Sequence, residues 1–494
     1  MSHRRRLAVF ASSLALSFTC PSALAATSEP ANAPTLDGHN ASPVPQRSKL
    51  PIAASDDLAV QSLRRRIIGL EKARLDNGLR VVMDSQPDAP TVAVCVTYDV
   101  GSRNEGPLQS GFAHLFEHMM FQGSRHVLKG KHFQMIASRG GTLNGTTSAD
   151  RTNYFETLPA NELKLALWLE ADRMRWLDVS EENLNNQRAV VKEEYRMRYE
   201  NAPYRLAQIE LDRNVFAGYL PYAHPTIGSL ADLDRASIDW VRDFHNSYYA
   251  PNNAVLTITG GFEPDEAMRW IHEYFDSAES HSIAHFVPPD ATPRPTSEVR
   301  LEVADKNAKT PALLMGWRIA PHSHPDHAAL ELLGRVLADG ESSLLYDLLV
   351  RQLAIARNVA AYSYDRAGPD ALVIHVEMTQ NARFDRVEST TQRILDLLAT
   401  KGPTLAQLDR AIQRAKSSLL IDLQSNQSRA TTFGEYEVLF GDARLVVADL
   451  EQLLAVSPKR VQQVMSQYIT TTSRTLVRVV PSEQHAPHRE DGRP

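Results

Sequence analysis

Short apolar runs alternate with longer amphipathic segments through residues 69–278. Two short β-prone runs flank Asn77 and Gly78 within residues 75–83, a pattern typical of a tight hairpin. Residues 91–100 are almost continuously apolar and predict a buried strand. Apolar residues then recur at helical spacing in residues 162–176, 181–198, 237–249 and 264–275. This half is therefore expected to combine a sheet with several helices.

The second half, residues 298–482, follows the same order of strand, loop and helix. When Gly340 is set against Gly123, the helix predicted at 325–337 aligns with a helix expected after residue 111. We therefore predict an α+β protein of two homologous halves, each an antiparallel-rich sheet packed with helices.

Four segments fall outside these halves. Residues 1–25 have three arginines, an apolar centre and an A-L-A cleavage site, which predicts a signal peptide and a periplasmic or secreted protein. Residues 26–68 and 279–297 are rich in Pro, Ala and Ser and are expected to be a disordered linker and an interdomain linker. Residues 483–494 form a polar tail.

Composition narrows the functional classes. The 494 residues are 43% hydrophobic and 23% charged, as in ordinary globular proteins. A net charge of −6 argues against a nucleic-acid partner, and the apolar run near the start is too short to span a bilayer comfortably. Cleavage would leave Cys95 as the only cysteine, which excludes an internal disulfide.

The strongest chemical signal is the sequence H-L-F-E-H at residues 114–118. In a helix, His114 and His118 lie one turn apart on one face and can hold one zinc ion. Glu117 lies close to that face, where a carboxylate can take a proton from an attacking water.

A second helix offers a further ligand. Glu194 shares an apolar stripe with Leu184 and Val191, where a carboxylate needs a partner such as a metal ion. Glu193 is rotated about 100° away on the same helix and is the alternative ligand.

Residues 140–148 read G-G-T-L-N-G-T-T-S, which predicts a turn followed by a thin, polar strand. Small residues at a sheet edge leave the backbone accessible to an extended peptide, although a plain hairpin edge has the same pattern.

Together these motifs resemble the pitrilysin/insulinase family of inverzincin metallopeptidases, in the two-domain branch that includes mitochondrial processing peptidase. The resemblance covers residues 70–482 and rests on H-x-x-E-H, a glutamate 76 residues later, and motifs at 140–144, 170–174, 249–254 and 342–346. It implies a zinc endopeptidase with one Zn²⁺ per chain, bound by His114, His118 and Glu194. Glu117 would be the general base, and a peptide would pair with Leu143, Asn144, Gly145 and Thr146.

Two departures qualify the resemblance. Gln187 stands where the family usually has a second glutamate, so it can hydrogen bond to a ligand without carrying charge. The family's catalytic members also have an arginine and a tyrosine seven residues apart in the second half, where this chain has Val350 and Arg357. Arg351 in a shifted register would be followed by Asn358. We therefore expect a heterodimer with a homologous subunit that lacks H-x-x-E-H, although a homodimer remains possible.

The sequence leaves other functions open. The main alternative is a non-proteolytic structural subunit of a processing-peptidase-like complex. A serine or cysteine hydrolase is disfavoured because no G-x-S-x-G motif occurs. His322, His324 and His327 could form a second metal cluster, but a Pro-flanked loop favours solvated histidines.

Overall fold

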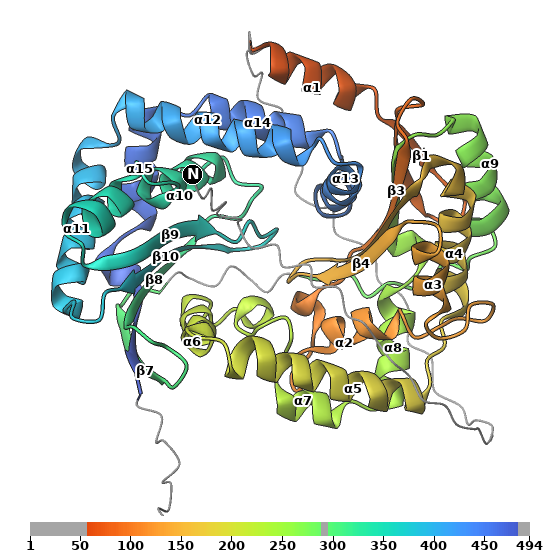
Figure 1. Ribbon diagram of the computed structural model, residues 1–494, viewed down its shortest axis with the longest axis horizontal. Helices are drawn as coiled ribbons and strands as arrows, with labels where there is room; N and C mark the ends of the chain where they lie inside the picture. Colours follow the sequence, from red (N-terminus) through yellow and green to blue (C-terminus); the bar gives the residue numbers. More distant parts are fainter. Residues whose placement is uncertain (1–56, 288–294, 483–494) are drawn as a thin grey trace, which may run out of the picture. The chain divides into compact units, whose positions relative to one another are not determined.

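The computed structural model describes residues 57–287 and 295–482. The predicted signal peptide, most of the predicted linker at 26–68 and the tail at 483–494 lie outside these residues. The α+β prediction is confirmed, because both halves combine a sheet with packed helices (Figure 1).

The first sheet has the strand order β1-β2-β6-β3-β5-β4. Strands β2 and β6 are parallel, and the remaining pairs are antiparallel. The β1–β2 hairpin turns at Gly78, whose φ of 87° suits glycine. The strands are β1 Glu71–Arg74, β2 Arg80–Ser85, β3 Thr91–Tyr98, β4 Thr142–Thr147, β5 Thr152–Pro159 and β6 Ala254–Gly260.

The second sheet has the order β7-β11-β8-β10-β9, with β7 and β11 parallel and the other pairs antiparallel. This order repeats β2-β6-β3-β5-β4 of the first sheet, as the predicted duplication requires. Strands β7 and β11, which are the first and last strands of this half along the chain, were not predicted from the sequence. The strands are β7 Val299–Asp305, β8 Ala312–Ile319, β9 Ala356–Ser363, β10 Asp370–Met378 and β11 Thr475–Pro481.

Most helices of each half cover one face of its own sheet. Those of the first half are α2 Phe112–Met119, α3 Lys131–Ala137, α4 Leu163–Trp176, α5 Glu181–Tyr195, α6 Arg205–Val215, α7 Leu230–Arg235, α8 Ile238–Tyr248 and α9 Pro264–Phe275. Those of the second are α10 His327–Ala338, α11 Phe384–Lys401, α12 Leu405–Asp422, α13 Asn426–Phe440, α14 Leu445–Leu454 and α15 Pro458–Tyr468. After α10, the segment Tyr346–Gln352 takes a π-helical form.

The two halves exchange helices. Helix α13 of the second half packs on β3, β5 and β6, and α6 of the first half packs on β8 and β11. In Figure 1, α13 accordingly lies beside the first sheet and α6 beside the second. Each sheet is thus buried on both faces, which explains its nearly unbroken apolar strands.

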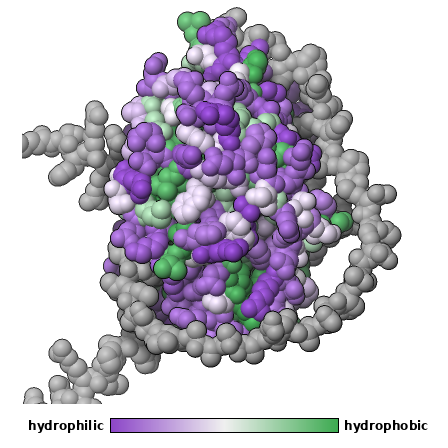
Figure 2. All heavy atoms as spheres, turned by 90° about the vertical axis from the view of Figure 1, so that its right-hand side faces the viewer, coloured by the Kyte–Doolittle hydropathy of each residue, from purple (hydrophilic) through white to green (hydrophobic). Residues whose placement is uncertain are grey.

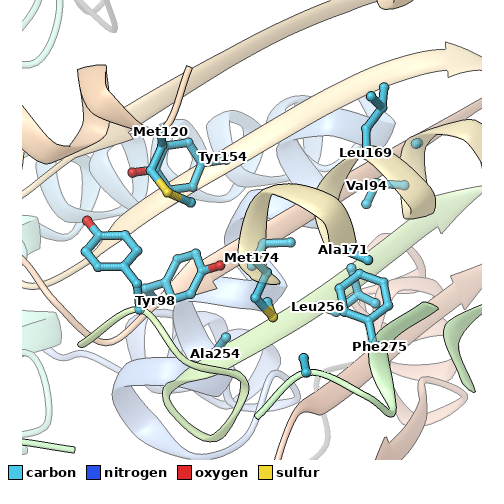
Figure 3. Close-up of a cluster of buried hydrophobic side chains, with 14 of the residues drawn as sticks. Val94, Tyr98, Met120, Tyr154, Leu169, Ala171, Met174, Ala254, Leu256 and Phe275 are labelled. Atoms are coloured by element: carbon cyan, nitrogen blue, oxygen red, sulfur yellow. The ribbon is translucent and has the colours of Figure 1, made fainter. Parts of the chain in front are cut away.

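The core of the first half lies between its sheet and α4. Figure 3 shows Leu169, Ala171 and Met174 of this helix among Val94 of β3 and Leu256 of β6. Buried residues of α2 and α5 pack into the same core, which fixes the position of both helices.

One predicted boundary is wrong. Residues 58–68, assigned above to the disordered linker, form helix α1 Leu58–Ile68. Its buried residues Val60, Leu63 and Ile67 pack with residues of α13 and α14, while Arg64 forms an ion pair with Glu451. This helix was not predicted because the arginines at residues 64–66 make the segment polar overall, although its three buried residues lie on one face. Between α9 and β7 the described residues form no helix or strand.

The face of the molecule in Figure 2 is mostly hydrophilic, with hydrophobic residues scattered over it. Among the described residues, no helix has the length and apolar character needed to cross a membrane.

Candidate metal centre

Helix α2 carries the H-x-x-E-H motif, and its start is fixed by a carboxylate. Gly111 adopts a φ of 100° just before the helix. Both oxygens of the buried Glu105 accept backbone hydrogen bonds, from the N–H groups of Gly111 and Ala113, each at 2.9 Å. A carboxylate at this position satisfies otherwise unpaired amides and complements the positive end of the helix dipole.

Packing then decides which side of α2 faces the site. Its apolar residues are buried in the core of the first half: Phe112, Ala113, Leu115, Phe116 and Met119. His114 and His118 are left on the opposite side, with their ring centroids 4.9 Å apart.

Helix α5, packed against α2, brings in the third group. Oε2 of Glu194 lies 3.3 Å from Nε2 of His118 and 3.8 Å from Nε2 of His114. The structure therefore brings together two imidazoles and a carboxylate that are 76 residues apart in sequence. Glu193, the alternative ligand, has a side chain that is 60% exposed and pairs with Arg196. It faces away from this cluster.

The three groups fit a zinc ion. Two nitrogens and a carboxylate oxygen are a common donor set of catalytic zinc sites, which leave a further position open. Oε2 of Glu194 is buried and has no hydrogen-bond partner among the described residues. Such an unsatisfied oxygen between two imidazoles is costly unless a cation completes it.

Burial and mutual charges shift these three pKa values. Burial and the neighbouring His118 lower the pKa of His114 to about 3. Burial also opposes the charge on His118, but the close approach of Glu194 and the charge of Glu117 raise its pKa overall. Glu194 has its pKa lowered to about 2, because His118, His114 and Arg198 outweigh the effect of burial.

Two further contacts hold the cluster. Oε1 of Gln187 lies 3.3 Å from Nδ1 of His118 and can accept a hydrogen bond from it. That contact directs Nε2 of His118 toward Glu194. Arg198, on the π-helical turns Arg196–Glu200 that follow α5, pairs with the other oxygen of Glu194 at 2.8 Å.

Glu117 lies beside the cluster and against strand β4. The hydroxyl of Thr147 donates to Oε2 of Glu117 at 2.5 Å. A Cβ on Gly145 would lie 3.1 Å from Cγ of Glu117, so the strand approaches the carboxylate closely only because Gly145 has no side chain. Burial raises the pKa of Glu117.

Strand β4 occupies the edge of the first sheet, as the sequence predicted. The N–H of Gly145 donates to Oδ1 of Asn144 at 2.9 Å. Leu143 and Asn144 are partly buried, whereas Thr146 is exposed. The role of these residues in peptide binding stays a prediction.

Comparison with known proteins identifies the family. A model described as "Insulinase (Peptidase family M16)" matches residues 80–218, and one described as "Peptidase M16 inactive domain" matches residues 235–415. The chain belongs to the insulinase family.

Relatives agree with this assignment. A zinc protease of Helicobacter pylori, PqqE, is 26% identical over 413 residues, which are 83% of this chain and 93% of the relative. A probable mitochondrial-processing peptidase subunit beta of Arabidopsis thaliana is 23% identical and covers 85% of this chain and 79% of its own length. The crystal structure of a protease from H. pylori superposes with a TM-score of 0.79 at 26% identity, covering 83% and 99% of the two chains. The first half of the periplasmic protease PqqL of Escherichia coli shares the fold at 18% identity, with a TM-score of 0.68 and coverage of 84% and 92%.

The second half of this M16 chain has no ligands at the position equivalent to α2. Helix α10 has Glu331, Gly334 and Arg335 there, and Nε of Arg335 lies 3.0 Å from Oε1 of Glu331. An ion pair therefore takes the place of the two histidines. Arg351 has a side chain that is 59% exposed and pairs with Asp347, while Arg357 is exposed on β9.

Sequence reasoning missed some residues of this M16 site and misjudged others. Thr147 contacts Glu117 from 30 residues further along the chain, whereas Glu105 lies only six and eight residues before Gly111 and Ala113; nothing in the local sequence marks either residue. The expectation of solvated histidines in the 322–327 loop is wrong for His322 and His327, which are 5% and 7% exposed. Helices α13 and α14 cover His322, and its ring stacks on Phe440.

Proposed function

We propose that this protein is a zinc-dependent endopeptidase that hydrolyses peptides bound in an extended form. The observation that carries the proposal is the separation of roles among four groups. His114, His118 and Glu194 converge, while Glu117 lies beside them and is held by Thr147 instead. A purely structural zinc site has no use for a free base and usually closes its fourth position. The zinc proteases among the relatives support the same function.

Glu117 is the proposed general base. A zinc ion held by His114, His118 and Glu194 supplies a Lewis acid for the scissile carbonyl and for the attacking water. Glu117 takes a proton from this water and later delivers it to the leaving amine. The raised pKa of Glu117 favours its protonated form, which delivers the proton to the leaving amine. The Thr147 hydroxyl keeps one oxygen of Glu117 in place while the other takes the proton from water.

The proposed substrate-binding element is the edge strand β4. A peptide added alongside Leu143, Asn144, Gly145 and Thr146 extends the sheet through main-chain hydrogen bonds. Its carbonyl oxygen would replace Oδ1 of Asn144 on the N–H of Gly145. Because Gly145 lies against Glu117, a peptide bound there has its backbone next to the base.

We further propose that the active form contains a second subunit. Val350 and Arg357 stand where the family pattern has its arginine and its tyrosine, and the residue seven after Arg351 is Asn358, so this chain lacks the expected pair at these positions. A homologous chain without H-x-x-E-H would supply it, and a homodimer is the alternative. The predicted signal peptide places this activity in the periplasm or outside the cell.

The deciding experiment uses Glu117→Gln in the full chain together with its partner. We expect the variant to keep about one zinc ion at this site and to lose peptide hydrolysis by roughly two orders of magnitude or more. Unchanged hydrolysis would overturn the proposal. Bound zinc with no hydrolysis in either protein would favour the non-proteolytic structural subunit.

A further inference from the structure

A second cluster of potential ligands lies in the other half of the molecule. His322 comes from the loop after β8, His327 is the first residue of α10, and Asp365 lies in the turn between β9 and β10. One ligand atom from each lies within 4.8 Å of the others. Oδ1 of Asp365 faces both rings: it contacts Nδ1 of His322 closely and lies 3.2 Å from Nε2 of His327.

We propose that His322, His327 and Asp365 form a second divalent-cation site, best suited to Zn²⁺. Two imidazoles and one carboxylate from three separate segments are a zinc donor set, and water can complete the coordination sphere. The side chain of Asp365 is 60% exposed, so ions and water have access from this side.

A second carboxylate holds His322 in the orientation that this site needs. Nε2 of His322 lies 2.7 Å from Oδ2 of Asp449 on α14, while Nδ1 points toward Asp365. Carboxylates that bind the far nitrogen of a histidine in this way fix its ring and strengthen it as a metal ligand. Stacking on Phe440, with ring centroids 4.4 Å apart, holds the ring further.

The charges around Asp365 also favour a cation. Its ion-pair partners among the described residues are the two histidines, with no lysine or arginine among them. Its position is fixed because Asp370 accepts hydrogen bonds from the backbone N–H groups of Tyr364 and Asp365. His327 is 7% exposed, and its Nδ1 has no hydrogen-bond partner in the described residues.

A proton competes for the same position. Burial disfavours the charged ring, but Asp365 and Asp449 together raise the pKa of His322 to about 10. A histidine binds a metal ion only in its neutral form, so a zinc ion would compete with the proton on His322. Zinc uptake at this site is therefore expected to release a proton and to strengthen with rising pH.

An ion at this position would brace the contact between the two halves. The next residues of the β9–β10 turn reach the first half, where the N–H of Ala367 donates to Asp150 at 3.0 Å and that of Gly368 to the Tyr222 hydroxyl at 2.9 Å. Asp150 lies in the turn between β4 and β5. The expected consequence is a higher melting temperature, without any change in the first site.

The test measures zinc per chain by elemental analysis after dialysis near pH ~8. We expect about two zinc ions in the wild type, about one in Asp365→Asn, about one in His118→Ala, and none in the double variant. His324→Ala is the matched control, because this histidine belongs to the same loop but its side chain is 44% exposed and faces Asp326. It should keep both ions. His327→Gln provides a second route to the same loss.

A thermal measurement gives an independent readout. Added zinc should raise the melting temperature of His118→Ala but not of the double variant with Asp365→Asn. If the wild type binds a single zinc ion that is lost in His118→Ala and kept in Asp365→Asn, the second site is overturned and the proposed peptidase stands. A single zinc with the opposite behaviour would support the second site and overturn the first. No bound zinc in the wild type would overturn both.

Discussion

The hydroxyl of Thr147 donates a hydrogen bond to Oε2 of Glu117 at 2.5 Å. This contact joins the edge strand β4 to the helix that carries the H-x-x-E-H motif. The strand proposed to bind substrate therefore also positions the proposed base. A displacement of β4 would also move the carboxylate of Glu117.

Thr147→Val tests this contact, because valine keeps the shape of threonine and removes the donor. The hydrogen bond lowers the pKa of Glu117, which burial raises. Without it the pKa rises further, and the acid limb of the pH profile of kcat/KM should move to higher pH. We expect a roughly 2- to 10-fold lower rate at neutral pH, since such a bond contributes about 0.5–1.5 kcal/mol. Thr142→Val is the control, because this threonine lies at the exposed start of the same strand and has no contact with Glu117. An unmoved acid limb in Thr147→Val would contradict this role.

Gln187 is expected to support zinc binding through His118. Replacing it with leucine removes the acceptor 3.3 Å from Nδ1 of His118, and zinc affinity should fall about 10- to 100-fold. Gln187→Glu should bind zinc at least as tightly as the wild type, because a charged acceptor makes the ring more basic. Competition with a chelator measures both. Asn185→Ala changes an exposed residue of the same helix and serves as the control. Equal affinity in all three variants would argue that Gln187 is only a packing residue.

Gly145 is expected to tolerate no side chain. Its Cβ would lie 3.1 Å from Glu117, 3.2 Å from Phe121 and 3.2 Å from Tyr154. Gly145→Ala should move β4 away from α2, lowering kcat about 10-fold or more, since small misplacements of reacting groups are costly. Zinc content and the far-ultraviolet circular dichroism should be unchanged. Thr142→Ala, at the exposed start of the same strand, should retain full activity; normal kinetics in Gly145→Ala would argue against the close approach.

The buried pair of His132 and Glu156 gives a prediction on pH and stability. Nε2 of His132 lies 3.0 Å from Oε2 of Glu156. Burial raises the pKa of Glu156 to about 8 and lowers that of His132 to about 3. The folded state thus holds a proton on Glu156 that the unfolded chain has lost above its ordinary pKa of 4.5. The stability this carboxyl contributes is therefore complete below that value and is lost as the pH rises through about 8.

Glu156→Gln mimics the protonated carboxyl, so this loss is absent from the variant. Its melting temperature relative to the wild type should rise steadily between pH ~4.5 and ~8. Differential scanning calorimetry across this range checks the trend. Glu193→Gln removes an exposed carboxylate and is the control. A pH-independent difference between Glu156→Gln and the wild type would indicate that Glu156 is ionised in the folded protein.

The helical part of the site could be predicted because it depends on local spacing. His114 and His118 must share a face of any helix, and the apolar stripe of α5 separated Glu194 from Glu193. The duplication was also visible, since both halves repeat the order of strand, loop and helix. These inferences need only the periodicities of helices and strands.

Other features depend on contacts between distant segments. Thr147 reaches Glu117 only because β4 pairs with β5 in one particular register. His322 is buried because helices α13 and α14, more than 100 residues later, cover its loop. Helix α1 was hidden because three arginines in a row dominate its composition, while only Val60, Leu63 and Ile67 contact the core. Local patterns carry no information on such packing.

The last prediction concerns the missing oxyanion partner. Val350 and Arg357 stand where the family pattern has its arginine and its tyrosine, and the nearby Arg351 pairs with Asp347. The loss of one oxyanion donor typically costs about 10²–10³ in kcat. We expect the purified chain to hydrolyse peptides at least about 100-fold more slowly than the complex with its homologous subunit, although zinc content and KM should be similar. Replacing the arginine or the tyrosine of that subunit should abolish the stimulation, whereas an exposed lysine changed on the same subunit should not. Full turnover by this chain alone, as a monomer or a homodimer, would show that its own residues complete the oxyanion site.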